Sequence, residues 1–283
     1  MSLAVVIIVV DLSLIWLGHR KVIASLAETA PATTAYMAQR AREGYPPRHQ
    51  RWVPLDSVPV SVVCAVLAAE DIRFYSHGTL DWGQQQAMLA RIIRGDLSRG
   101  NSGISQQLAR NLFLSPRRTP LRKLREYLLA YQISHALSKD RQLELYLNVV
   151  EWGEGVWGIA AASEHLFARP LAALTPTEIV LLANVLPAPR RGLAFPLSAR
   201  RRGKLDWVAS TLWREAVLDD LTWGAMTARV KRMADFVDAG MTPREAAAAA
   251  AGEMGAEPAM VPDRWEPPLA PELECEPNRR ILF

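Results

Sequence analysis

Two clear helix starts constrain the fold of this chain more than any other feature. Thr119 is followed by Pro120, so a side chain able to cap a helix stands before proline at the first helical position. The segment TPTE at 175–178 is a capping box, again with proline at the first helical position. Leucines repeat at helical spacing after the first start, and an apolar run follows the second. Both segments are therefore predicted to be helices, over about 120–137 and 176–186.

Helical periodicity dominates the chain from residue 59 onward, and no segment shows a convincing strand pattern. Pro59 suits the first position of one helix, and Ser102 can cap another helix that begins at about residue 103. Further helices are expected over about 59–70, 82–94, 103–112 and 156–167, with two or three more between 200 and 253. The sequence therefore predicts an all-α fold.

The N-terminus carries an apolar run over residues 2–18. As a helix this run would span about 24 Å at roughly 1.5 Å per residue, less than the ~30 Å hydrocarbon core of a bilayer. Asp11 interrupts the run, where a carboxylate costs about 2.5–3.5 kcal/mol on insertion scales. The alternative is the core of a cleaved signal peptide. We favour a membrane anchor over residues 1–23.

Composition divides the rest of the chain into four segments. Residues 24–51 form a linker with one helix, 52–199 the main domain, and 200–253 a helical extension, while the acidic, Pro-rich tail at 254–283 is expected to be disordered. Residues 256–283 hold six acidic residues and three arginines, a charge of −3, so the net charge of +4 leaves about +7 for the remainder. A basic body suits an anionic partner: phosphate, nucleic acid or a membrane surface.

Two adjacent carboxylates end the helix expected at 59–70. Glu70 and Asp71 close an apolar run, and the aromatic residues Phe74 and Tyr75 follow. Acids at a helix C-terminus oppose the macrodipole, which favours cations there. A carboxylate held against that field is a candidate for proton transfer near neutral pH. The alternative is a solvated helix end with no chemical role.

Basic side chains gather in the next part of the sequence. The segment GNSGISQQLARN at 100–111 places small residues before a helix, where backbone N–H groups can bind an anion; alone, it is equally an ordinary loop and cap. Arg122, Lys123 and Glu126 share one helix face, and as surface ion pairs they would contribute well under about 1 kcal/mol each. With Arg110 nearby, they are better interpreted as a phosphate-binding wall.

In this order, the motifs of the chain resemble those of the family-51 peptidoglycan glycosyltransferases over about residues 52–190. The matching patterns are Glu70-Asp71-x-x-Phe74-x-x-His77, Gly100-x-Ser102-x-x-x-Gln106-Gln107-x-x-x-Asn111, Arg122-Lys123-x-x-Glu126, Leu143-Glu144-x-Tyr146-Leu147-Asn148, and Gly158-x-x-x-Ala162 followed by residues 181–189. The segments NLFLSP at 111–116 and VEWGEG at 150–155 are most similar to the monofunctional biosynthetic transglycosylases.

This resemblance implies a lysozyme-like helical domain, docked on a membrane, that polymerises lipid II with inversion at the anomeric carbon. By motif match, Glu70 is the general base on the acceptor hydroxyl. Glu126 is implied to manage the diphosphate, directly or as a ligand of a divalent cation, Mg²⁺ or Mn²⁺. Arg110, Arg122 and Lys123 are implied to neutralise the diphosphate as it leaves.

The resemblance also implies further contacts, partners and a location. Substrate contacts are expected at Ser102 and Gln107, and supporting roles at Asp71, Phe74, His77, Asn111 and Asn148. The expected partners are lipid II, the lipid-linked glycan strand and a membrane, with cell-wall synthesis proteins as further candidates and no nucleic acid. The expected location is the inner membrane, single-pass, with the catalytic domain on the periplasmic side.

Three positions depart from the family pattern. Gly103 stands where the second motif has a hydroxyl residue, Thr79 where a glycine is usual, and Ser134 where the third motif's helix has a later Glu. Both principal carboxylates remain. A weakly active or non-catalytic paralogue that scaffolds cell-wall synthesis is therefore an alternative. A lytic muramidase is another, although a glycan hydrolase has no diphosphate for a basic wall to hold.

Overall fold

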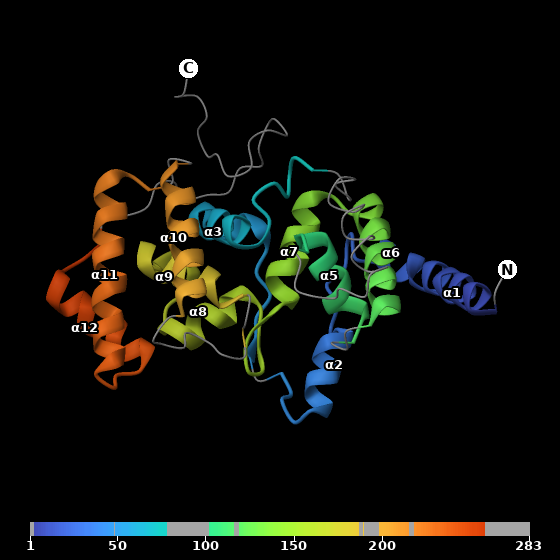
Figure 1. Ribbon diagram of the computed structural model, residues 1–283, viewed down its shortest axis with the longest axis horizontal. Coiled ribbons are helices and arrows are strands. Elements are labelled where there is room, and N and C mark those ends of the chain that lie inside the picture. The colour runs from blue at the N-terminus through green and yellow to red at the C-terminus, as the bar shows by residue number, and fades with distance from the viewer. Residues whose placement is uncertain are drawn as a thin grey trace, which may run out of the picture. The chain divides into compact units, whose positions relative to one another are not determined.

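In the computed structural model of the chain, the described residues are 3–47, 49–77, 102–115, 119–186, 189, 198–214 and 218–257, and they are mostly helical (Figure 1). They divide into two compact units. The first comprises residues 1–47 and 74–150, and the second residues 48–73 and 151–283. The helix expected over 82–94 and the tail after residue 257 lie outside the described residues.

The first unit is built around α5. Its helices are α1 (Leu3–Ser25), α2 (Ala35–Arg42), α5 (Ile104–Phe113), α6 (Pro120–Ala136) and α7 (Lys139–Val149). Helix α5 packs against α2, α6 and α7, and Figure 1 shows α5, α6 and α7 close together. Leu108, Leu129, Ile133 and Leu145 are fully buried in this packing. The predicted cap of α6 is confirmed, because the Arg122 backbone N–H donates to the Thr119 hydroxyl over 3.1 Å.

The start of α5 differs from the prediction. Helix α5 begins at Ile104 with Gly103 as its N-cap, which makes no side-chain capping bond, so Ser102 is not the cap. The Ser102 hydroxyl instead accepts a hydrogen bond from Lys123 Nζ over 2.9 Å. A largely buried ammonium group needs acceptors, and this requirement outweighs the gain from a helix cap.

Helix α1 packs along α6. Arg125 Nε donates to Asp11 Oδ2 over 2.8 Å, and a second guanidinium nitrogen bonds Asp11 Oδ1. Gln132 Nε2 donates to the Trp16 carbonyl over 2.7 Å. The acidic residue that interrupts the apolar run is therefore matched by a cation of the neighbouring helix.

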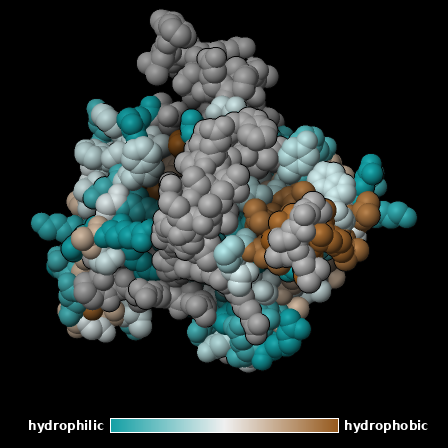
Figure 2. Space-filling view, turned by 45° about the vertical axis from the view of Figure 1, so that its right-hand side comes forward, coloured by the Kyte–Doolittle hydropathy of each residue, from teal (hydrophilic) through white to brown (hydrophobic). Residues whose placement is uncertain are grey.

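Other faces of α1 remain apolar and exposed. They carry Val5, Ile7, Val9, Val10, Leu14 and Leu17, and Figure 2 shows hydrophobic side chains gathered on the side of the molecule where α1 lies. Within the part of the chain that the structure describes, no helix is both long and apolar enough to cross a membrane.

The second unit contains α3 (Val60–Glu70) and further helices from the C-terminal half of the chain. These are α8 (Ile159–Phe167), α9 (Pro176–Val185), α10 (Ala199–Arg214), α11 (Asp220–Asp238) and α12 (Pro243–Met254), with short 3₁₀ turns η1 (Leu55–Ser57) and η2 (Leu171–Ala173). Helix α3 contacts both α9 and α10. Every residue of α3 from Val60 to Ala68 is buried, including Cys64. Pro59 is the N-cap of α3, so the helix begins at Val60, one residue after the predicted first helical position.

A small sheet corrects the all-α prediction. Strand β1 (His49–Gln50) pairs in parallel with β3 (Val156–Trp157), and β3 pairs antiparallel with β2 (Glu151–Gly153). The helix expected from residue 156 begins instead at Ile159. Gly155 and Gly158 adopt φ values of 72° and 84°, which favour glycine and permit the turn and the sharp helix start. Strands this short show no alternation that sequence could reveal.

The C-terminal helices are tied to α9 by polar contacts. The Thr177 backbone N–H donates to Glu257 Oε2 over 3.2 Å, and the Thr177 hydroxyl also donates to the Glu257 carboxylate. Arg229 Nη2 donates to the Gly255 carbonyl over 2.7 Å. The Glu257 side chain is 1% exposed, so the first part of the acidic C-terminal segment takes part in the packing of the second unit.

The capping box of α9 gives a testable prediction for stability. Thr175→Ala removes the acceptor for the Glu178 backbone N–H. We expect a loss of about 1 kcal/mol, seen as a fall of roughly 2–4 °C in the thermal midpoint. Glu178→Gln is the control, because its amide oxygen can still accept from the Thr175 N–H and should preserve the midpoint more closely. Equal midpoints for Thr175→Ala and wild type would contradict the assignment.

Candidate active site

A buried carboxylate between two cations forms the centre of the candidate site in the first unit. Glu126 on α6 is 0% exposed. Arg122 Nη1 donates to Glu126 Oε2 over 2.6 Å, and Lys123 Nζ bonds Glu126 Oε1. These three side chains come from the predicted face of α6, one turn after its capped start. We call Arg122, Lys123 and Glu126 the α6 cluster.

Lys123 joins α6 to the start of α5. Besides Glu126, its Nζ donates to Ser102 Oγ over 2.9 Å and to Gln106 Oε1 over 3.4 Å. Burial lowers the pKa of Lys123 below its ordinary 10.5, Glu126 opposes this shift, and the positive charges of Arg110 and Arg122 add to it. The structure thus brings Ser102 and Arg110 close to the α6 cluster.

The side chain of Gln107 is held by hydrogen bonds to two other residues of the first unit. Its Nε2 donates to the Ser102 carbonyl over 2.9 Å, and the Tyr146 hydroxyl donates to its Oε1 over 3.2 Å. Gln107 therefore fixes the segment before α5, which carries the Ser102 hydroxyl to Lys123.

The α6 cluster has donor capacity that the described protein atoms do not use. Arg122 Nε is buried and makes no hydrogen bond within the described residues. An unpaired buried N–H costs free energy unless a ligand or water satisfies it. A guanidinium group with an open donor beside an ammonium group is the arrangement that binds a phosphate or diphosphate oxygen.

The α6 cluster does not fit the predicted divalent cation. Both oxygens of Glu126 already bond positively charged groups, which would repel a metal ion placed on the same carboxylate. Among the described residues, no group of three His, Cys, Asp or Glu side chains could hold a metal ion. We therefore derive no step through a metal.

The second candidate carboxylate lies in the second unit, at the end of α3. Glu70 is the last residue of α3, and Asp71 is its C-cap, whose N–H donates to the Leu67 carbonyl over 2.8 Å. Lys204 Nζ on α10 donates to Glu70 Oε1 over 2.8 Å. The helix end predicted from the sequence is confirmed, and Asp71 closes it through its backbone.

The residues after Glu70 are fastened to α7. Lys139 Nζ donates to the carbonyls of Phe74, over 2.6 Å, and His77, over 3.0 Å, and lies 4.4 Å from the centre of the buried Phe74 ring. The Tyr75 hydroxyl donates to Asp140 Oδ1 over 2.8 Å. Phe74 and the His77 backbone thus support the local structure of the first unit.

Two asparagines predicted as supporting residues bond their own helices. Asn111 Nδ2 donates to the Gln107 carbonyl over 2.9 Å, and Asn148 Nδ2 donates to the Glu144 carbonyl over 2.8 Å. Both side chains are buried. Each stabilises the end of the helix that carries it.

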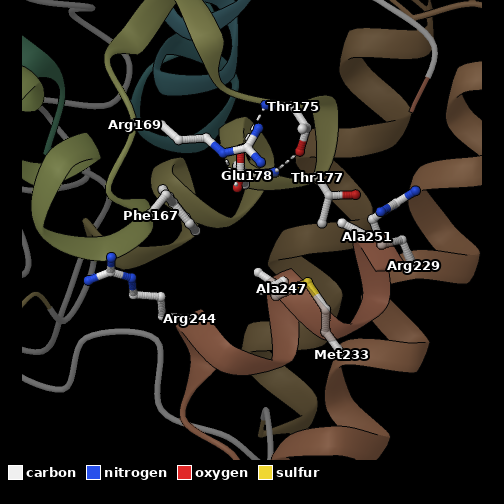
Figure 3. Close-up of a pocket in the computed structure, with 11 residues that line it drawn as sticks. Phe167, Arg169, Thr175, Thr177, Glu178, Arg229, Met233, Arg244, Ala247 and Ala251 are labelled. Carbon is white, nitrogen blue, oxygen red and sulfur yellow. Dashed lines mark hydrogen bonds and ion pairs between the residues drawn. The ribbon is translucent and has the colours of Figure 1, made fainter. Parts of the chain in front are cut away.

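A separate cavity of about 110 Å³ lies in the second unit, between α8, α9, α11 and α12 (Figure 3). Phe167, Met233 and Ala251 give it an apolar lining, and Arg169 Nε lies 3.6 Å from Glu178 Oε1. Burial raises the pKa of Glu178, an effect that its bonds to Thr175 and the charge of Arg169 oppose. None of the predicted site residues, all of which the structure describes, lines this cavity.

Sequence reasoning missed two lysines that contact the predicted motifs. Lys204 bonds Glu70, and Lys139 bonds the carbonyl of Phe74, four positions after Glu70. Neither lysine belongs to a recognisable motif, and each lies more than 60 positions from its partner. Only helix packing brings them together, so no local pattern could have found them.

Similarity to known proteins identifies the chain as a transglycosylase. The sequence profile of the family described as Transglycosylase matches residues 37–212, and the chain belongs to that family. Among curated relatives, the biosynthetic peptidoglycan transglycosylase of Rhodospirillum centenum is 43% identical over 161 residues, which cover 57% of this chain and 70% of that protein. The protein of the same name from Aromatoleum aromaticum is 42% identical over 168 residues, covering 57% and 73%. That from an Azoarcus species is 41% identical over 189 residues, covering 62% and 82%.

The α6 cluster predicts pH-dependent binding of inorganic diphosphate. Lys123→Ala should weaken binding roughly 10- to 100-fold, the worth of a charge-assisted hydrogen bond. In wild type, binding should fall as the pH rises, and the fall should begin below the ordinary lysine pKa of 10.5, because a lowered pKa releases the proton earlier. Lys123→Arg should extend binding to higher pH, since the guanidinium keeps its proton.

Isothermal titration across pH measures these affinities. Lys231→Ala is the matched control, because it removes one exposed positive charge from α11. Equal losses in Lys123→Ala and Lys231→Ala would show that net charge alone governs binding and would remove Lys123 from the anion site.

Proposed function

We propose that this protein is a peptidoglycan glycosyltransferase that polymerises lipid II into glycan strands. The observation that carries the proposal is the α6 cluster, two cations around a buried carboxylate in which Arg122 Nε has no hydrogen-bond partner among the described residues. Membership of the transglycosylase family and the names of its relatives supply the substrate class.

In the proposed reaction, the 4-hydroxyl of the acceptor GlcNAc attacks the anomeric carbon of the lipid-linked donor. Glu70 takes the proton of that hydroxyl as the new C–O bond forms. The bond from the anomeric carbon to the diphosphate oxygen breaks, and undecaprenyl diphosphate leaves with the electron pair. Attack from the face opposite the leaving group inverts the α linkage to β.

The leaving diphosphate needs charge stabilisation rather than a proton. Arg122 and Lys123 donate hydrogen bonds in a largely buried setting, with side chains 13% and 11% exposed. Fixed donors in such a setting stabilise developing charge more than they would in water. Glu126 keeps the two cations close together and offsets their mutual repulsion.

The two alternative functions fit the site less well. A lytic muramidase would use the general acid–base chemistry of a Glu but leaves the α6 cluster without a role. The altered second motif, with Gly103 in place of a hydroxyl residue, is the feature that favours a non-catalytic scaffold. Ser102 of that motif, however, still places its hydroxyl on Lys123.

Glu70→Gln tests the proposed function. With labelled lipid II in detergent, wild type should form glycan polymer. Glu70→Gln should lose roughly 10²- to 10⁴-fold in rate, the typical contribution of a general base. Polymer is measured by gel electrophoresis of the labelled product.

Three other outcomes would contradict the proposal. Clearing of finished peptidoglycan without polymer would identify a muramidase. Inactivity of wild type with retained binding to cell-wall synthesis proteins would identify a scaffold. Full activity of Glu70→Gln would assign the base to another group.

We also propose that α1 attaches the protein to the inner membrane, with the catalytic domain in the periplasm. The exposed apolar faces of α1 support this proposal, and Leu14 and Leu17 are 66% and 68% exposed. Burial of such side chains in lipid is favourable by roughly 1.5–3 kcal/mol each.

Leu17→Asp should reduce cosedimentation with vesicles of anionic phospholipid, because a carboxylate in lipid costs up to about 3 kcal/mol. Leu221→Asp on α11 is the matched control, since Leu221 is 71% exposed. Equal pelleting of Leu17→Asp and wild type would argue against membrane attachment through this face of α1.

A further inference from the structure

A cation from the C-terminal part of the chain holds the proposed base. Lys204 Nζ on α10 lies 2.8 Å from Glu70 Oε1, and the two side chains are 23% and 11% exposed. Lys204 follows every motif that the sequence matches, and neither composition nor motif spacing assigns it a role.

Helix α10 is fixed against α3 close to this pair. Trp207 Nε1 donates to the Ala68 carbonyl over 3.1 Å, and Leu205 and Val208 are buried. Trp207 is three positions after Lys204, so both side chains leave α10 on the side that meets α3. The packing of α10 on α3 therefore fixes the position of the Lys204 ammonium group, which does not move as a side chain on an open surface would.

The end of α3 is a place where a carboxylate needs a cation. The C-terminal end of a helix carries partial negative charge, which repels Glu70 and attracts an ammonium group. Asp71 and Arg73 follow Glu70 in the chain, while α9, which also packs on α3, contains one charged residue, Glu178, in its first turn. Among the described residues, Lys204 on α10 is a charged group that helix packing brings within bonding distance of the Glu70 carboxylate.

We propose that Lys204 is a positioning residue for the glycosyl transfer. It holds the Glu70 carboxylate in one orientation, in which the carboxylate can accept the proton of the acceptor hydroxyl. In the reaction the proton passes to Glu70, and Lys204 keeps its own proton and remains a cation beside the neutral carboxyl. This inference rests on the proposed glycosyltransferase function.

The test compares Lys204→Met with Lys204→Arg in the lipid II polymerisation assay. Lys204→Met keeps the length of the side chain but removes its charge. We expect kcat to fall roughly 10- to 100-fold, with the KM for lipid II changed far less. Lys204→Arg should recover most of the turnover.

Two variants on α10 separate positioning from packing. Arg202→Met removes an exposed charge two positions away and should leave turnover unchanged. Trp207→Phe removes the bond to Ala68, so it should lower the thermal midpoint while retaining turnover. A Lys204→Met variant that matches Trp207→Phe in both respects would show that Lys204 only packs α10 onto α3, which would overturn the inference.

The double variant Glu70→Gln/Lys204→Met completes the test. If Lys204 acts through Glu70, the double variant should be no slower than Glu70→Gln alone. Multiplication of the two single losses would overturn the inference. An inactive wild type overturns the proposed function itself, whereas an active wild type with a fully active Lys204→Met overturns only the role of Lys204.

Discussion

The first unit depends on the burial of one charge, the Glu126 carboxylate. A carboxylate removed from water must be paired and hydrogen-bonded, and Glu126 meets this requirement through Arg122 and Lys123. Two cations around one anion leave a net positive charge, and Arg122 Nε makes no hydrogen bond within the described residues. The Thr119 cap starts α6 one turn earlier, and Ser102 and Gln106 bring α5 to the same ammonium group. The atoms that pack α5 onto α6 are therefore the same atoms that the proposed anion site would use.

The surroundings of the two principal carboxylates assign them different roles. Glu126 is closed from solvent and bonds a cation through each oxygen, so proton transfer there would break two charge-assisted bonds. Glu70 is partly exposed at a helix end and receives Lys204 on one oxygen. Two acids of similar intrinsic strength are thus separated into a structural anion and a candidate base by what surrounds them.

Local sequence signals predict the helices well and the contacts between them poorly. The caps at Thr119 and Thr175 fix two helix starts, because capping and proline placement are properties of four consecutive residues. The face shared by Arg122 and Glu126 follows from helical spacing alone. The hairpin at 151–157 is too short to alternate, and the partners of Glu70 and Asp11 come from positions more than 100 residues away. Such pairs are set by tertiary packing, which cannot be inferred from a single sequence taken alone.

The Asp11–Arg125 pair fixes how far the α6 cluster lies from the apolar helix α1. Arg125 is adjacent to Glu126 and three positions from Arg122, and a helical turn rises only about 5.4 Å. With α1 held in lipid as proposed, the depth of Asp11 sets the height of the α6 cluster above or within the headgroup layer. A lipid-linked diphosphate lies at that same layer, tethered by its own tail. One acidic residue in an otherwise apolar helix would then place the cationic groups of the α6 cluster at the same depth in the membrane as the phosphates.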